Sequence, residues 1–319
     1  MTIKQGILSL IFILLGINSL NAKTQQTDIV PDGTYLYALK DSCELYMDIY
    51  NPVKGSETSV GGQQKPLIVF VFGGGFIGGR RDDPAYLPWF RMMSEDGYKI
   101  ISIDYRLGLK GSKSVGIAQV NDLDKAIHLA VEDLYSAIGY ILDNADMLGV
   151  EKDNIVICGS SAGAITVLQA DYELANRSGC SNVLPEDFRF AGVMSFSGGI
   201  LSRSGALKYR DKPAPTLLVH GTADKLVNYK QIRFFNLGFF GSDKIAARWK
   251  KLGIPYNIVR FTDHGHEVAG FLDITTELQK DFIKTNVLKK SNVTTDQTIS
   301  DPSLEKGSGS QTRKELYGK

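Results

Sequence analysis

The sequence predicts an α/β protein with a mostly parallel central sheet and helices on both of its faces. Two observations lead to this fold class: short, continuous apolar runs recur along the chain, and stretches with a helical apolar period lie between them. A continuous apolar run is typical of a strand that is buried on both faces of a sheet. Strands that alternate with helices form parallel sheets, because each helix connects one strand to the next.

The predicted elements follow one another in a regular order. Residues 34–50 hold two aromatic and β-branched runs around a polar turn, which predicts an N-terminal β-hairpin. The apolar runs that predict sheet strands are 66–72, 99–104, 154–158, 190–196, 215–220 and 256–261. The stretches with a helical period are 123–147, 162–174, 243–252 and 268–283. The connections at 175–189 and 198–212 are too short for a large cap domain, so we expect none.

Both ends of the chain lie outside this pattern. Residues 1–22 have a short positive start and an uncharged apolar run, and end at Ala22, which is the layout of a secretory signal peptide. The run is shorter than the roughly 20 residues of a membrane helix, so we expect export to the periplasm or the medium without stable membrane insertion after cleavage. Residues 286–319 are polar and lack an apolar period, which predicts a disordered tail. One domain, residues 27–285, remains between the two ends.

The composition limits the class of protein. The chain has 319 residues, 43% of them hydrophobic and 22% charged, which is ordinary for a globular protein with a large core. Lys and Arg number 36 against 35 Asp and Glu, so the net charge of +1 gives no general attraction for nucleic acid. Three cysteines are too few for a disulfide scaffold. We expect Cys158 to be a small core residue, and Cys43 and Cys180 to stay unpaired.

A Gly-x-Ser-x-Gly motif, residues 159–163, follows the apolar run at 154–158 and opens the next helical stretch. On a sharp turn from strand to helix, the central serine has a strained backbone conformation, so the residues two positions away must be small. The turn exposes the Ser161 hydroxyl and directs the Ala162 amide, at the helix N-terminus, toward a developing oxyanion. The motif therefore predicts Ser161 as a nucleophile.

A run of three glycines, residues 73–75, follows the apolar run at 66–72. Glycines let the backbone approach a ligand closely, and beside a serine nucleophile they indicate the other half of an oxyanion hole. Residues 73–78 also match the dinucleotide-binding pattern G-x-G-x-x-G. The chain continues there into a loop instead of a helix. Arg80 and Arg81 stand where a phosphate-binding P-loop needs Lys and Ser or Thr, so nucleotide binding is disfavoured.

A carboxylate and a histidine stand at the ends of the last two predicted strands. A serine nucleophile needs a base that takes its proton, and the base needs a carboxylate that fixes its tautomer. Asp224 and His266 supply these groups, in the chain order Ser161, Asp224, His266. His264 is the competing base, and His220, which closes a strand, is interpreted as hydrogen-bonded structure. No group of Cys, His, Asp and Glu has metal-site spacing, so we expect no metal.

These motifs together resemble the carboxylesterases of the α/β-hydrolase superfamily, close to bacterial esterases that carry an HGGG motif. The similar segments are Asp48-Ile49-Tyr50-Asn51-Pro52, Asp104-Tyr105-Arg106-Leu107, the Gly-x-Ser-Ala-Gly motif, the His-Gly-Thr-Ala-Asp turn at 220–224 and the pair Gly265-His266. The resemblance spans roughly residues 34–284. It implies an α/β-hydrolase fold in which Ser161 is the nucleophile, Asp224 the acid and His266 the base.

The resemblance also implies that the amides of Gly74, Gly75 and Ala162 form the oxyanion hole, with no organic cofactor. The chain departs from the family pattern at Phe72, where the family usually has a His that helps to fix the glycine loop. Its N-terminus is a hairpin and not a helical cap, which implies an open site for small esters or decorated carbohydrates. Arg80, Arg81 and Trp89, after the glycines, are candidates for substrate contact or for a solvated surface loop.

The sequence therefore predicts an exported serine esterase that hydrolyses carboxylic esters, including acyl groups on carbohydrates, through an acyl-enzyme. We expect a small-molecule or carbohydrate ester as its partner, and no nucleic acid. Two alternatives remain: a serine peptidase or amidase, because the same groups serve both reactions, and a non-catalytic binding protein that keeps the fold. The sequence predicts no particular oligomeric state.

Overall fold

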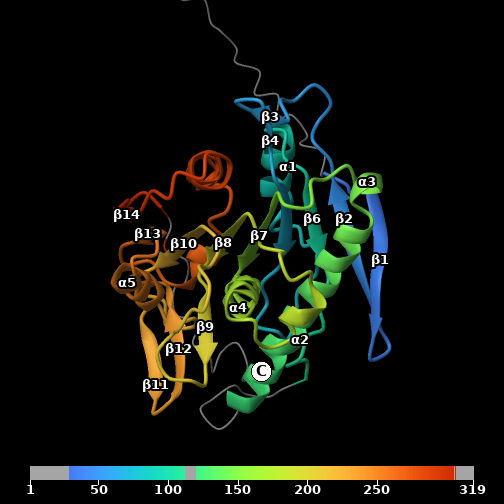
Figure 1. The fold of residues 1–319 in the computed structure, drawn as a ribbon. Coiled ribbons are helices and arrows are strands. Elements are labelled where there is room, and N and C mark those ends of the chain that lie inside the picture. Colours follow the sequence, from blue (N-terminus) through green and yellow to red (C-terminus); the bar gives the residue numbers. More distant parts are fainter. Residues whose placement is uncertain (1–28, 112–119, 305, 307–319) are drawn as a thin grey trace, which may run out of the picture.

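A computed structural model describes residues 29–111, 120–304 and 306 and shows one large sheet with helices on both faces (Figure 1). The strand order is β1-β2-β6-β5-β7-β8-β10-β13-β14. These strands are β1 (Gly33–Lys40), β2 (Cys43–Tyr50), β5 (Leu67–Val71), β6 (Ile100–Ile103), β7 (Ile155–Ser160), β8 (Gly192–Phe196), β10 (Thr216–Gly221), β13 (Asn257–Phe261) and β14 (Thr295–Ile299). The predicted fold class and N-terminal hairpin are confirmed.

Within this sheet, β2 is antiparallel to both of its neighbours, and the strands from β6 to β14 run parallel to one another. The central strands β5, β7, β8 and β10 are buried along their whole length, because helices cover both faces. Their largely apolar sequences follow from that burial. The parallel strands all end at one edge of the sheet, which we call the carboxyl edge.

The helices form two layers. α2 (Val120–Asp143) contacts α4 (Ala162–Asn176) on one face, and α1 (Leu87–Glu95) contacts α6 (Thr276–Phe282) on the other (Figure 1). α5 (Ser242–Leu252) packs against β10 and β13. The shorter helical segments are α3 (Ala145–Leu148), η2 (Ser181–Val183), η3 (His266–Gly270) and the π-helical turn η4 (Ile283–Leu288). The single helix predicted over 268–283 is thus divided among η3, α6 and the start of η4.

A second, three-stranded sheet of order β11-β12-β9 lies beyond the carboxyl edge, at the lower left of Figure 1. Its strands are β9 (Gly199–Ser202), β11 (Gln231–Phe234) and β12 (Leu237–Gly241). A two-stranded ribbon pairs β3 (Ser59–Val60) with β4 (Gln63–Gln64). These strands and α1 were not predicted from the sequence. The turn around Asn236, between two aromatic runs, was the signal for the β11–β12 hairpin.

The predicted disordered tail at 286–319 is wrong for its first part. Residues 283–288 form η4, and β14 adds a parallel strand to the edge of β13. The Thr295 amide donates to the Tyr256 carbonyl and the Thr262 amide to the Ile299 carbonyl. Main-chain pairing of this kind needs no apolar period, so β14 has a polar sequence whose inner residues are exposed. Residue 305 and residues 307–319 lie outside the described residues.

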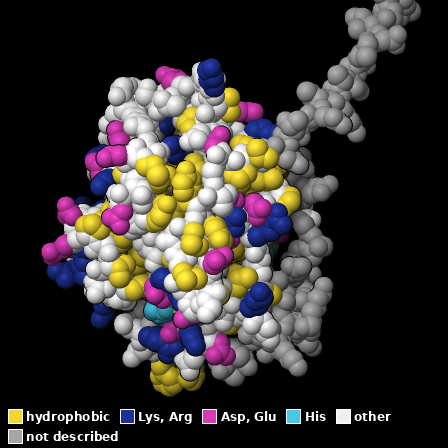
Figure 2. Space-filling model, turned by 90° about the vertical axis from the view of Figure 1, so that its right-hand side faces the viewer, with side chains coloured by type: hydrophobic (Ala, Val, Ile, Leu, Met, Phe, Trp, Pro, Cys, Tyr) yellow, Lys and Arg dark blue, Asp and Glu magenta, His cyan; other side chains and the backbone are white. Residues whose placement is uncertain are grey.

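The predicted signal peptide, residues 1–22, also lies outside the described residues. Within residues 29–111 and 120–304, no helix combines the length and hydropathy that a membrane span requires. Cys43, Cys158 and Cys180 are free thiols; Cys158 is buried, as predicted for a small core residue. On the face drawn in Figure 2, cationic and anionic side chains are interspersed, in keeping with the near-zero net charge.

The C-terminal strand leads to a prediction about stability. A chain that ends at residue 290 lacks β14 and the ion pair between Arg260 and Asp296, so the backbone edge of β13 opens to water. We expect a loss of about 1–2 kcal/mol in the free energy of unfolding, which lowers the melting temperature by about 3–6 °C. Differential scanning calorimetry measures the change. A chain that ends at Lys306 is the control, and equal melting of the two chains would contradict the role of β14.

The buried carboxylate of Asp171, in α4, leads to a prediction about pH. Burial raises its pKa from 3.8 to about 7, although the Ala214 amide, at 3.1 and 3.2 Å from its two oxygens, and the charge of Arg189 act in the opposite direction. Between pH 3.8 and 7 the unfolded chain has released a proton that the folded chain keeps. The free energy of unfolding therefore falls as pH rises through this window.

Replacing this carboxyl with an amide, in Asp171→Asn, removes the titration. We expect the variant to gain about 2 kcal/mol relative to the original chain when pH rises from 5 to 8. Urea denaturation of both chains at the two pH values measures the difference. The same pH dependence in both chains would show that Asp171 is not the group responsible.

Candidate active site

Ser161 occupies a sharp turn between β7 and α4. Its φ of 52° and ψ of −114° lie outside the helical and extended regions, so the backbone is strained there. A Cβ atom on Gly159 would lie 2.3 Å from the Gly163 carbonyl oxygen, and one on Gly163 would lie 1.9 Å from the carbonyl oxygen of Val71. Both positions of the Gly-x-Ser-x-Gly motif therefore require glycine. The serine hydroxyl is presented at the carboxyl edge of the sheet.

The structure brings Ser161, His266 and Asp224 together from three separate strand ends. Ser161 Oγ lies 2.7 Å from His266 Nε2, and His266 Nδ1 lies 2.7 Å from Asp224 Oδ2. Because Nδ1 faces a carboxylate, it carries the ring proton, and Nε2 then accepts from the serine hydroxyl. The His266 ring is one-fifth exposed and the Asp224 side chain is buried. This arrangement can remove the proton from the serine as its oxygen attacks an electrophile.

The Asp224 carboxylate is held by donors on both of its oxygens. Oδ1 accepts from the amides of Leu226 at 2.9 Å and Val227 at 3.0 Å. Oδ2 lies 3.2 Å from His220 Nε2 as well as 2.7 Å from His266. Burial alone would raise the pKa of Asp224, but the hydrogen bonds with the two histidines lower it to about 2. Asp224 is therefore ionised at neutral pH, as a partner for an imidazolium must be.

His264, the competing base, lies elsewhere. Its ring is buried between Phe261 and Phe271, at centroid distances of 6.0 and 5.6 Å. Its Nδ1 faces Glu267 Oε1 at 3.1 Å, and its carbonyl accepts from the Ala223 amide at 2.9 Å. These contacts give His264 a structural position beneath the loop that carries His266.

The glycine run passes directly beside the nucleophile. A Cβ atom on Gly73 would lie 3.2 Å from Ser161 Cβ. Gly74 and Gly75 have φ values of 122° and 64°, and a Cβ on Gly74 would lie 2.2 Å from the Gly78 carbonyl oxygen. The turn therefore requires glycine at Gly74. Ala162 opens α4 on the other side of Ser161, where a helix leaves its first amides without intrahelical partners.

Two tyrosines, neither of them identified as site residues from the sequence, fix this loop. The Tyr105 hydroxyl donates to the Phe72 carbonyl at 3.0 Å, and its ring stacks on Phe72 at 4.4 Å. On the other side, the Gly73 amide donates to the Tyr86 hydroxyl at 3.0 Å. Tyr86 also bonds to the side chain of Ser160, whose hydroxyl donates to the Ala269 carbonyl at 2.8 Å. A chain of hydrogen bonds thus joins the glycine loop, the serine turn and η3.

The candidates for substrate contact after the glycines have structural partners. Arg81 pairs with Asp48 at 2.9 Å and with Asp104 at 2.7 Å. Trp89 is buried, and its Nε1 donates to Gln279 Oε1 at 2.9 Å. Arg80 pairs with its near neighbour Asp82 on the surface. The loop sequence could not show these pairings, because Asp48 and Gln279 come from distant parts of the chain.

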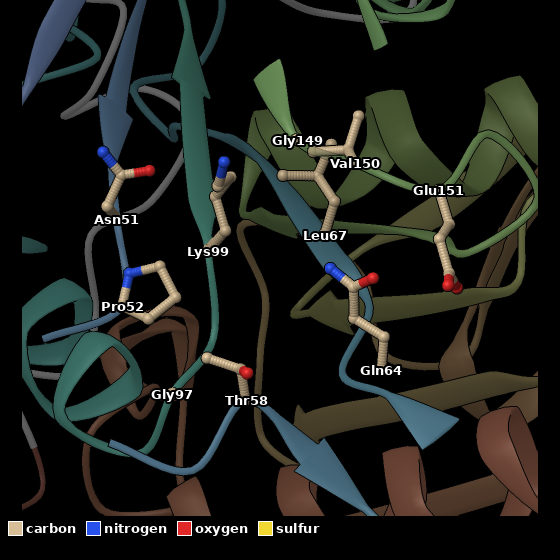
Figure 3. A pocket seen from close by; sticks show the side chains of 10 residues that line it. All are labelled: Asn51, Pro52, Thr58, Gln64, Leu67, Gly97, Lys99, Gly149, Val150 and Glu151. Atoms are coloured by element: carbon tan, nitrogen blue, oxygen red, sulfur yellow. The ribbon is translucent and has the colours of Figure 1, made fainter. Parts of the chain in front are cut away.

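A hollow of about 240 Å³ lies at the opposite edge of the sheet (Figure 3). Leu67 and Lys99, at the amino ends of β5 and β6, line it, together with Asn51, Gln64 and Glu151. It contains none of the predicted site residues. Among the residues that the structure describes, no group of three or more His, Cys, Asp and Glu could hold a metal ion.

Comparisons with known proteins agree with this geometry. The BD-FAE family model matches residues 47–198. Acetylcholinesterase of Gallus gallus is 29% identical over 40% of the chain and 15% of its own length, and bile salt-activated lipase of Mus musculus is 28% identical over 44% and 22%. Carboxylesterase 1C of Rattus norvegicus is 29% identical over 39% and 20%. The chain thus spans about a fifth or less of the length of these curated relatives.

The fold also has solved counterparts. The apo form of Thermogutta terrifontis esterase 2 superposes with a TM-score of 0.56 at 22% identity, over 83% of this chain and 96% of that one. The propionate-bound form of the same esterase gives a TM-score of 0.54 at 22% identity. From the sheet topology, the serine turn and these matches, the chain has the α/β-hydrolase fold and is similar in sequence to carboxylesterases.

Proposed function

We propose that the protein is a serine carboxylesterase in which Ser161, His266 and Asp224 form the catalytic triad. The proposal rests on two contacts of 2.7 Å at the carboxyl edge, one between Ser161 Oγ and His266 Nε2 and one between His266 Nδ1 and Asp224 Oδ2. Ser161 Oγ attacks the ester carbonyl while its proton passes to His266 Nε2. Asp224, ionised and buried, stabilises the imidazolium that forms.

The amides of Gly74, Gly75 and Ala162 hold the negative oxygen of the tetrahedral intermediate. When the intermediate collapses, His266 gives its proton to the leaving alkoxide, and the acyl group stays on Ser161. A water molecule then attacks the acyl-serine and passes a proton to His266. His266 returns this proton to Ser161 Oγ as the second tetrahedral intermediate collapses, and the carboxylic acid leaves. Each oxyanion donor of this kind contributes about 2.7–4 kcal/mol to the stabilisation of the transition state.

The proposal extends to an exported enzyme that acts on small esters, including acyl groups on carbohydrates. Export is supported by the signal-like sequence at residues 1–22. Small substrates are supported by the short connections 175–189 and 198–212, which add no large cap domain. Thermogutta terrifontis esterase 2 has been solved with propionate and with butyrate bound, which supports short acyl groups as first probes.

Hydrolysis of p-nitrophenyl acetate, propionate and butyrate tests the proposed reaction. We expect turnover of at least one of these esters, and a drop of at least about 1,000-fold in kcat for Ser161→Ala, because the nucleophile is lost. Ser94→Ala, which removes another buried serine hydroxyl away from the site, is the control and should keep full activity.

A peptide p-nitroanilide in the same assay separates the alternatives. If the chain cleaved the anilide in preference to the esters, its activity would be that of a peptidase or amidase and not that of an esterase. A folded chain that turns over neither class of substrate would favour a binding protein that keeps the fold.

The Tyr86 hydroxyl leads to a second prediction. In Tyr86→Phe the Gly73 amide loses its acceptor, and the glycine loop loses one of its two anchors. Because oxyanion donors act mainly in the transition state, we expect kcat to fall about 10-fold with little change in KM. Tyr37→Phe, which removes a hydroxyl 2.6 Å from the Asp104 carbonyl, is the matched control. An unchanged kcat in Tyr86→Phe would contradict this role of Tyr86 and would show that Tyr105 alone is enough to anchor the glycine loop.

A further inference from the structure

The proposed reaction uses one histidine on Asp224, but the structure places two there. His220, in β10, is fully buried, and its Nε2 lies 3.2 Å from Asp224 Oδ2 and 3.1 Å from the Val227 carbonyl oxygen. Its Nδ1 lies 2.8 Å from the Ser242 hydroxyl, at the start of α5. His220 is hydrogen-bonded, as its place at the end of a predicted strand indicated, and its contact with the acid of the triad gives it a more specific role.

The partners of the His220 ring determine where its proton lies. Nε2 faces two acceptors, a carboxylate and a carbonyl, so it carries the proton and donates to them. Nδ1 is then the acceptor, and the Ser242 hydroxyl donates to it. A neutral ring in this tautomer satisfies every partner. Ser242 is itself fully buried, so it fixes the ring in one orientation.

The other charged groups around His220 are engaged away from Asp224. Arg260 is the register partner of His220 on β13, but it pairs with Asp296, and its Nε donates to the Tyr229 hydroxyl at 2.6 Å. The Tyr229 ring lies edge-on to His220 at 5.4 Å, and its hydroxyl is 3.5 Å from Asp243. Asp224 is therefore the carboxylate that His220 contacts.

We propose that His220 is a positioning residue for the triad acid. Its Nε2–H bond directs Asp224 Oδ2 toward His266 and takes a share of the negative charge on that oxygen. The inference rests on the proposed function, because it assigns His220 a part in the same triad. This bond determines how much negative charge on Asp224 Oδ2 faces His266. It therefore also affects the pH range in which His266 can act as a base.

The direction of the effect follows from electrostatics. Without the His220 donor, more of the charge on Oδ2 is available to a protonated His266 ring, which is then stabilised. The ring keeps its proton to higher pH, so the acid limb of the kcat/KM profile moves upward by about 0.5–1 pH unit. The carboxylate is also less well oriented, so we expect the plateau of kcat to fall several-fold.

Three variants test the proposal. His220→Leu removes the donor, and His220→Gln replaces Nε2–H with an amide N–H at a similar distance from the backbone. We expect the full upward shift in His220→Leu and a limb close to that of the unsubstituted chain in His220→Gln. Ser242→Ala frees Nδ1 and should give a smaller shift in the same direction. Thr216→Val, which removes another buried hydroxyl from β10 far from Asp224, is the control.

Two readouts keep the inference separate from the esterase proposal. The first is the pH profile of kcat/KM with p-nitrophenyl acetate. The second is the NMR titration of the His266 ring, which needs no substrate. A shifted titration in a chain without ester turnover would support the positioning role and refute the esterase. If His220→Leu does not fold, Ser242→Ala carries the test.

The proposal would be overturned if folded His220→Leu showed no shift in the acid limb of the kcat/KM profile and none in the His266 titration. If the Leu variant does not fold, the same result in Ser242→Ala would overturn it. Equal shifts in the Gln and Leu variants would also overturn it, because the amide donor would then make no difference.

Discussion

The site depends on one close approach between backbones. At Gly163, helix α4 lies so near to strand β5 that a single additional carbon would collide with the Val71 carbonyl oxygen. This contact fixes the start of α4 against the sheet. It therefore places Ser161 at the end of β7 and beside the glycine loop that continues from β5. A larger side chain at this position would push α4 away from β5. Ser161 and the Ala162 amide would then move away from the glycine loop that holds the other proposed oxyanion donors.

The features that the sequence predicted well are those encoded by local patterns. Continuous apolar runs identified most strands of the parallel sheet, since burial on both faces favours apolar side chains, as in β5 and in β7 up to Cys158. The glycine spacing around Ser161 reflects a local steric limit. Chain order and strand ends were enough to bring Asp224 and His266 to Ser161, because parallel strands end at one edge.

The features that the sequence did not predict depend on contacts between distant segments. β14 is polar and exposed, and it is a strand because β13 offers it a backbone edge. Arg81 follows the glycines, as a residue that binds substrate could, but Asp48 and Asp104 occupy its guanidinium. No local pattern marks Tyr86 as a partner of Gly73, since the contact depends on how α1 packs.

The departure at Phe72 has a structural explanation. A histidine before the glycines would fix the loop by hydrogen bonds of its own side chain. Here the Phe72 ring stacks on Tyr105, and the bonds come from the hydroxyls of Tyr105 and Tyr86 to the backbone on either side. The groups that anchor the loop thus belong to neighbouring segments and not to the loop itself. The loop can therefore keep its shape with an apolar residue at its base.

The position of β14 also bears on the order in which the protein is completed during synthesis. The edge of β13 is covered by residues 295–299, which the ribosome adds only after the rest of the sheet and every residue of the proposed triad. Until those residues emerge, the nascent chain presents an open strand edge of the kind that pairs with other chains. β14, the C-terminal strand of the sheet among the described residues, therefore covers an edge through which an unfinished molecule can pair with other chains.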